Sequence, residues 1–470
     1  MNFSWKIVID AGAISMALLA ATLIRSRVRF FQRFMIPNAL TAGFLLLPLY
    51  NYVFPAMGHE TNRLGELVYH LLNISFVAMT LRAAPPQTHK KSGGVLGTTT
   101  GILSQYAIQA LTGLLLAYLL IVTVSPKLNP AIGLFLPLGF ALGPGQAFAI
   151  GRGWESLGFA GAGSLGLTFA ALGYLWACFA GVWLINYGVK KGWLHKEALQ
   201  AFQDKGMMTG IVPKDRERPV GARLTTDSEA VDSFSFHAGM VAGTYFLSYL
   251  LLKVLTWGLS LAGNAGRELA VNLWGINFIF SALTAQLVRF VMVKLKVTHV
   301  LDDSTLSRMS GFAVDYMVAG AIAAISLVFV GQYWKEILLL STVCGILTTI
   351  TVPWMASRMF KDYRFERMMM IYGCSTGTLS TGLALLRVLD PEFRTPVTSD
   401  YMVSAGLTFL MAIPFILAIN LPAKAGQTGD MMPFWIMVIL SGIYLTVTLG
   451  MYVFLARRRT LAQAGKIWHP

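Results

Sequence analysis

The sequence predicts an all-α polytopic membrane protein with two inverted five-span repeats, each with a re-entrant hairpin, plus one extra C-terminal span. Its composition is 55% hydrophobic and only 13% charged, whereas soluble proteins carry roughly 25% charged residues. Apolar runs of about 20 residues recur along the chain, and each can cross a bilayer as a helix. They lack the alternation that barrel strands show. The same order of runs recurs on both sides of one long polar stretch.

The basic charge of the chain does not indicate a nucleic-acid partner. The net charge is +15, but most basic residues lie in clusters between the apolar runs, where such residues orient a protein in the membrane. No basic module stands apart from these runs. We therefore expect membrane lipid, and no nucleic acid, around the chain.

Neither an enzyme nor a metalloprotein is indicated. The sequence contains no phosphate-binding loop, no G-x-S-x-G elbow and no H-E-x-x-H motif. The three cysteines and seven histidines have no metal-ligand spacing, and we expect Cys178 and Cys344 to be small buried residues. We expect no enzyme activity, no cofactor and no transition metal, and the missing phosphate loop argues against an ATP-driven pump.

Eleven apolar runs predict membrane spans. The first run is followed by Arg25, Arg27 and Arg29 rather than by a small-residue cleavage site, so we interpret it as a retained span and not as a signal peptide. The predicted spans cover residues 5–24, 37–54, 63–82, 94–124, 157–189, 237–262, 270–292, 309–330, 334–356, 396–422 and 431–456.

Two glycine-rich stretches do not fit as plain spans. Residues 133–151 and 367–390 are too short, and too rich in Gly, Ser and Thr at their centres, to cross as one helix. We predict that each is a re-entrant hairpin, the first entering from outside and the second from the cytoplasm. With the N-terminus outside and the C-terminus cytoplasmic, this layout places most of the 37 basic residues on the cytoplasmic side.

The polar linker 193–236 divides the chain into similar halves. Residues 1–192 and 237–424 each read as four spans, a hairpin and a span, and 425–470 add one span and a basic tail. Aligning Gln146 with Thr381 brings two further pairs into register, namely Arg152 with Arg387 and Glu155 with Asp390. The first half starts outside and the second starts inside, so the repeats are inverted. The linker itself reads as a solvated connector.

Inverted repeats with interrupted segments in matching positions are typical of secondary transporters. Free helix N-termini suit an anionic group, and freed carbonyls suit Na⁺. The predicted substrate-binding residues are Gly143, Pro144, Gly145, Gln146, Ser375, Thr376, Gly377, Thr378 and Arg387. Helix–helix hydrogen bonding is the alternative for each hydroxyl, and a surface pair with Asp390 is the alternative for Arg387.

The predicted cation site centres on Asp315, a carboxylate inside the span 309–330. It could bind Na⁺, accept a proton or hold a substrate ammonium; a pair with Arg308 near the membrane surface is the alternative. The other predicted cation ligands are Ser380, Thr381, Asn73, Ser75 and Thr80. The last three could equally serve as structural hydrogen-bonding residues.

Several of these residues resemble a known family. Ile36-Pro37 opens the second span with Gly43 after it, Glu155, Gly158 and Phe159 follow the first tip, and Gly373-Cys374 opens the second. In these features residues 5–422 resemble the bacterial sodium/glutamate symporters (ESS-type). The resemblance implies Na⁺-coupled import of glutamate across the bacterial inner membrane. It also implies a homodimer in which a core moves past a scaffold, as in an elevator.

The chain departs from the family at both tips. At the first tip the family has Gly-Gly-His-Gly, and this chain has Gly143-Pro144-Gly145-Gln146. At the second tip the family has a longer glycine series and a Thr-Pro, and this chain has Gly377-Thr378-Leu379-Ser380-Thr381. The span 431–456 is additional. Three alternatives therefore stay open. The same scaffold could carry another organic anion or use H⁺, the chain could be an ion channel, or it could be a membrane-embedded enzyme or receptor.

Overall fold

The structure is a computed structural model of the chain. It describes residues 5–34, 36–58, 63–82, 93–193, 209–212, 220–227, 229–261, 263, 270, 273–390 and 395–469. Every regular element in these residues is a helix, and none of them forms a strand. Most of the predicted linker 193–236 lies outside the described residues.

Ten helices in the described residues are long and apolar enough to cross a membrane, which indicates a multi-pass membrane protein. They are Lys6–Arg27 (α1), Asn38–Ala56 (α3 to α4), Arg63–Leu81 (α5), Gly94–Thr123 (α6), Ala162–Lys190 (α8), Ser233–Ser260 (α10), Asn277–Lys294 (α12), Trp334–Met359 (α15), Val397–Thr428 (α18 and α19) and Met432–Arg459 (α20 and a final turn). Each corresponds to a predicted span.

The predicted span 309–330 is the exception. The chain there forms α13 (Asp303–Ala323) and the short α14 (Leu327–Gln332). α13 begins earlier than predicted because the Asp302 side chain accepts a hydrogen bond from the Thr305 N–H and caps the helix. Its charged residues, including Asp315, keep it out of the ten apolar helices. It packs along α5 and α3 instead, so other helices cover much of it.

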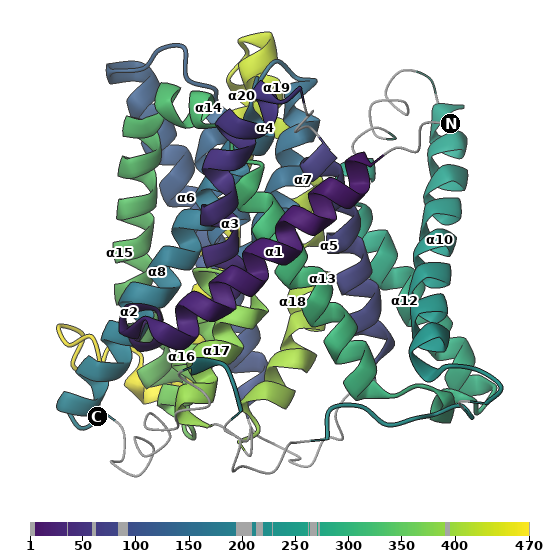
Figure 1. The fold of residues 1–470 in the computed structure, drawn as a ribbon. Helices are drawn as coiled ribbons and strands as arrows, with labels where there is room; N and C mark the ends of the chain where they lie inside the picture. Colours follow the sequence, from purple (N-terminus) through teal and green to yellow (C-terminus); the bar gives the residue numbers. More distant parts are fainter. Residues whose placement is uncertain are drawn as a thin grey trace.

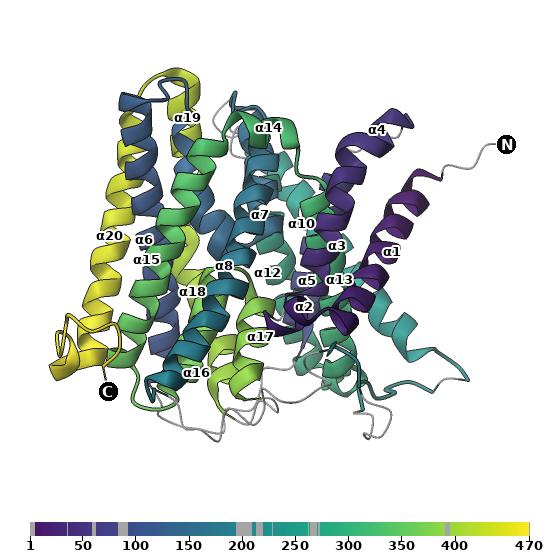
Figure 2. The ribbon, with the colours of Figure 1, turned by 60° about the vertical axis from the view of Figure 1, so that its left-hand side comes forward.

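The helices form two groups. In the first group, α13 packs on α5 and α3, α5 packs on α12, α1 packs on α3, and α10 packs on α12. In the second group, α6 contacts α20, α18 and α15, and α8 contacts α15. Figure 2 shows the groups side by side, with α20, α6 and α15 on the left and α1, α3 and α10 on the right. We call them the α5–α13 group and the α6–α15 group.

The two ends of the bundle carry different short elements. In Figure 1, α4, α14 and α19 lie at the upper end, and α2, α16, α17 and the C-terminus lie at the lower end. The helix α1 begins at the upper end and runs downward (Figures 1 and 2). The chain therefore begins and ends on opposite sides of the bundle.

Two helical hairpins lie within the α6–α15 group. The first hairpin contains a 3₁₀ turn (Pro130–Leu134), a π-helix (Leu136–Leu142) and α7 (Pro144–Glu155). The second contains α16 (Arg364–Ser375) and α17 (Leu379–Leu389). Each of the predicted stretches 133–151 and 367–390 therefore contains two short helical segments joined by a turn.

The bases of the hairpins lie at opposite ends of the bundle. After the first hairpin, Gly161 lies against Phe329 of α14 at the upper end. At the start of the second hairpin, Phe365 packs on Trp468 of the C-terminal tail at the lower end, with ring centroids 5.7 Å apart. Cys178 and Cys344 are buried among the helices between these ends, as predicted.

Candidate functional site

The tips of the two hairpins meet. Gly143 forms the first tip and has φ +93°, a backbone conformation that favours glycine. A Cβ atom at this position would lie 2.5 Å from Thr378 Cγ2 of the second tip. Pro144 then occupies the first position of α7, where its missing N–H is not needed. The first tip can therefore contact the second only because residue 143 has no side chain.

Hydrogen bonds between two threonines build the second tip. Thr378 caps α17, and the side chains of Thr378 and Thr381 each accept a hydrogen bond from the other's backbone N–H. The Thr381 hydroxyl also donates to the Gly373 carbonyl oxygen at 2.8 Å. The predicted cation ligand Thr381 thus uses its hydroxyl within the turn. The side chain of Ser380, another predicted ligand, lies outside the described residues.

Glycines let the two arms of the second hairpin approach closely. A Cβ atom on Gly373 would lie 2.6 Å from the Cα atom of Gly382. This contact brings α16 and α17 together just behind the tip. The C-terminus of α16 and the N-terminus of α17 therefore lie next to each other.

Two helix N-termini converge on this place. α7 begins at Pro144 and α17 begins at Leu379, each one residue after the tip residues that meet. The first N–H groups of a helix have no intrahelical acceptor, and the helix dipole adds partial positive charge there. The arrangement therefore suits an anion, and Gly145 and Gln146 contribute N–H groups from the first turn of α7. Gln146 is buried in this turn.

Tyr174 connects the tips to the other helix group. Its phenol on α8 donates a long hydrogen bond of 3.4 Å to Thr378 Oγ1. The Asp315 carboxylate on α13 lies within electrostatic range of this phenol. No ion pair between Asp315 and Arg308 occurs in the described part of the chain. Asp315 itself is exposed on α13, and among the described residues it makes no hydrogen bond or ion pair with the tips. Sequence analysis missed Tyr174, because it lies in a continuous apolar run.

Gln109 connects the second tip to α6. Its Nε2 atom donates to the Ser375 carbonyl oxygen at 2.9 Å and to Thr348 Oγ1 of α15 at 3.2 Å. Ser375 and Thr376 are both buried, and Thr376 donates back to the Tyr372 carbonyl oxygen at 2.8 Å. Gln109 was not predicted. Its only signal in the sequence is a polar residue inside an apolar helix.

Other predicted residues lie away from the tips. Arg387 is exposed on α17, eight residues beyond its start, which is about 12 Å along a helix. It lies within electrostatic range of Arg25 on α1. Its predicted partner Asp390 accepts hydrogen bonds from the Thr395 N–H and hydroxyl, at 2.8 and 2.6 Å. The structure therefore does not bring Arg387 to the tips.

The predicted cation ligands on α5 serve helix packing. Asn73 Oδ1 accepts from the Ser281 hydroxyl of α12 at 2.8 Å, and Asn73 Nδ2 donates to the Tyr69 carbonyl oxygen. The Ser75 hydroxyl donates to the Leu72 carbonyl oxygen. The third of these predicted ligands, Thr80, is half-buried near the end of α5. These contacts match the structural alternative for Asn73 and Ser75.

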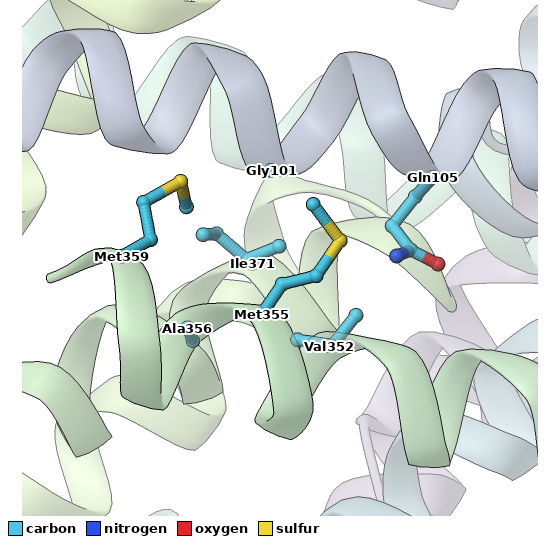
Figure 3. Close-up of a pocket in the computed structure, with 7 residues that line it drawn as sticks. All are labelled: Gly101, Gln105, Val352, Met355, Ala356, Met359 and Ile371. Carbon is cyan, nitrogen blue, oxygen red and sulfur yellow. The ribbon is translucent and has the colours of Figure 1, made fainter. Parts of the chain in front are cut away.

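A small apolar pocket lies beside the second hairpin (Figure 3). Methionine side chains of α15 and Ile371 of α16 face one another across it, with Gln105 of α6 at one end. Its lining is Gly101, Gln105, Val352, Met355, Ala356, Met359 and Ile371. The pocket carries no charged residue, so it does not suit a dicarboxylate. Neither Gly143 nor Thr378 lines it, so the pocket does not include the residues where the tips meet.

No group of three or more His, Cys, Asp and Glu residues in the described ranges could hold a metal ion. Comparison with protein-family models, curated proteins and solved structures gives no match. The function must therefore be argued from the geometry of the tips.

Proposed function

We propose that the chain is a secondary active transporter that imports glutamate, or a related acidic amino acid or carboxylate, in symport with Na⁺. The observation that carries the proposal is the contact between Gly143 and Thr378. Through it, two helix N-termini from hairpins based at opposite ends of the bundle face one place. Interrupted helices of this kind hold anionic substrates and coupling ions in transporters of known mechanism.

The helix packing supports an inverted repeat. If residues 1–192 and 237–424 are repeats, then α1, α3 and α5 correspond to α10, α12 and α13. In the same way α6, the first hairpin and α8 correspond to α15, the second hairpin and α18. The first set forms the α5–α13 group and the second set forms the α6–α15 group. Corresponding elements thus share a group, as a pseudo-two-fold axis requires.

In this proposal the tips form one site that opens to alternate sides. The anionic substrate lies at the N-termini of α7 and α17. Its carboxylate oxygens accept hydrogen bonds from the free N–H groups of these two helices. Tyr174 reaches the second tip from α8, and Asp315 lies on α13 of the α5–α13 group. The α6–α15 group would move relative to the α5–α13 group within a homodimer in the bacterial inner membrane. The N-terminus would lie outside and the C-terminus in the cytoplasm.

Uptake of radiolabelled L-glutamate into liposomes that contain the purified protein tests the proposal. We expect accumulation that needs an inward Na⁺ gradient and that unlabelled glutamate inhibits. Uptake of another organic anion, but not of glutamate, would retain the transporter and change the substrate. If folded protein takes up none of a panel of organic anions, or if it conducts single-channel currents, the proposal is wrong.

Coupling to H⁺ is a second candidate, and the position of Asp315 favours it. Its carboxylate could carry the proton, because it lies within a predicted span and makes no ion pair with Arg308 in the described part of the chain. Asp315→Asn distinguishes the two modes. A proton carrier should lose gradient-driven uptake but retain exchange of internal for external substrate. If Na⁺-driven uptake persists unchanged, Asp315 is not the coupling residue.

A further inference from the structure

Two glutamines one turn apart on α6 have different surroundings. Gln105 exchanges hydrogen bonds with Thr351 of α15. Its Nε2 atom donates to Thr351 Oγ1 at 3.1 Å, and the same hydroxyl lies 3.3 Å from Gln105 Oε1. Both ends of this carboxamide therefore lie within hydrogen-bond distance of a hydroxyl, which also donates to the Leu347 carbonyl oxygen at 2.8 Å.

Gln109 has a partner at one end only. Its Nε2 atom donates to the Ser375 carbonyl oxygen and to Thr348 Oγ1. Gln109 is only 1% exposed, so its Oε1 atom is buried. This oxygen nevertheless accepts no hydrogen bond from the described residues. A buried oxygen without a donor costs free energy, so such an atom calls for an explanation.

A second buried oxygen without a partner belongs to the serine whose carbonyl oxygen Gln109 contacts. Ser375 Oγ is also buried and makes no hydrogen bond with the described residues. Gln109 Nε2 donates to the carbonyl oxygen of the same serine at 2.9 Å, so the two residues are in direct contact. Ser375 is the last residue of α16. The last carbonyls of a helix lack intrahelical donors, and the helix dipole adds partial negative charge at this end.

These groups share one chemistry, since an amide oxygen, hydroxyl oxygens and helix carbonyls are hard, neutral ligands. Such ligands suit Na⁺, which freed carbonyls and helix C-termini coordinate in transporters. We propose that Gln109 Oε1, Ser375 Oγ and the carbonyl end of α16 bind Na⁺ behind the second tip. The proposal deepens the proposed function, on which it rests, by giving the coupling ion a site.

The position of this site explains how the ion would be coupled to the substrate. The ion would tie α6 to α16, and α16 leads through Gly377 into the Thr378 cap of α17. Binding of Na⁺ would therefore hold the second tip in the conformation that presents the N-terminus of α17. A cation next to the substrate site also stabilises a bound anion electrostatically.

Thermal unfolding of the purified full-length protein tests the site, with choline chloride replacing NaCl at constant ionic strength. We expect the unfolding temperature of the wild type to rise with Na⁺ in a saturable way. Ser375→Ala should be at least as stable as the wild type in choline, because it removes a buried hydroxyl without a partner. Its Na⁺ midpoint should be raised about tenfold or more, which corresponds to about 1.4 kcal/mol.

Gln109→Leu should raise the Na⁺ midpoint in the same way. Gln105→Leu is the matched control, because it removes an amide of equal size one turn away whose bonds are satisfied by Thr351. We expect its Na⁺ midpoint to match that of the wild type. The site is rejected if Ser375→Ala and Gln109→Leu retain the wild-type midpoint, or if Gln105→Leu shifts it equally.

The wild type alone separates this site from the transport proposal. If Na⁺ and choline stabilise it equally while it still takes up an organic anion, the site is wrong and a buried water fills it. Saturable stabilisation by Na⁺ that both variants weaken, in protein that takes up none of the anions tested, would retain the site and reject the transport proposal.

Discussion

The first hairpin turns at a glycine, whereas the second turns on a pair of threonines. Gly143 adopts a positive φ and leaves space for Thr378. Thr378 and Thr381 instead satisfy the start of α17 with side-chain hydrogen bonds. The first tip therefore depends on the absence of a side chain, and the second on the presence of two hydroxyls. A substitution in the first tip therefore matters through the space that the new side chain needs. A substitution in the second tip matters through the hydrogen bonds that it keeps or removes.

The hairpins also differ in their ion pairs. Arg152 and Glu155 of the first hairpin are 2.5 Å apart, but the arginine side chain is 61% exposed. Arg367 of the second hairpin is fully buried and lies 2.8 Å from Asp400 of α18. Its guanidinium also lies over the Phe360 ring at 5.3 Å. The buried pair fixes the base of the second hairpin to α18, while the exposed pair stays within the first hairpin.

Breaking the buried pair should have the largest effect. Arg367→Ala removes the guanidinium that pairs with the Asp400 carboxylate, and it also removes a packed side chain. We therefore expect the free energy of unfolding to fall by about 3–5 kcal/mol. Chemical unfolding in detergent measures it. The double variant Arg367→Ala with Asp400→Ala is the control and should recover part of the loss. If the single variant costs less than about 1 kcal/mol, the pair does not anchor the hairpin.

Gly143→Ala should affect transport most strongly. The new Cβ atom would lie 2.5 Å from Thr378 Cγ2 at a positive φ, which costs about 1–3 kcal/mol in strain. We expect substrate uptake to be abolished. Thr378→Ser in the same chain removes the clashing methyl group and should restore part of the uptake. Gly153→Ala on α7 is the matched control, because nothing lies within 4 Å of its Cβ position. Equal activity of the two alanine variants would contradict the contact between the tips.

Thr381→Val tests the threonine pair of the second tip. It keeps the shape of the side chain but removes the hydroxyl that accepts from Thr378 N–H and donates to Gly373 O. We expect a loss of about 1–2 kcal/mol in unfolding free energy. Thr381→Ser retains the hydroxyl and should lose less than half of that. Equal losses in both variants would show that the methyl group contributes as much as the hydroxyl.

The smallest effect is expected for Arg152→Ala. The pair with Glu155 is exposed, so we expect a change of less than about 1 kcal/mol in unfolding free energy, which salt should reduce further. The measurement is the same unfolding experiment at low and high ionic strength. A loss as large as that of Arg367→Ala would remove the difference between the two hairpins.

Sequence analysis located the two helix interruptions but not the residues that contact them. Glycine and threonine at positions 143 and 378 marked interruptions in apolar sequence, and the structure has turns at both. Tyr174 and Gln109 were missed because a single polar group in an apolar helix gives no sign of what it faces. Arg387 was assigned to the substrate site because its planar guanidinium can pair with a substrate carboxylate, yet α17 carries it about two turns away from the tip.

By itself the sequence determined the membrane-spanning helices and the places where helices break. Hydrophobic length and glycine content act locally, so they can be read along the chain. Only the tertiary structure decided that Gly143 meets Thr378, that Gln109 reaches Ser375, and that Tyr174 reaches Thr378. These contacts join residues far apart in the chain, and the packing of whole helices fixes them. No local pattern can record such packing.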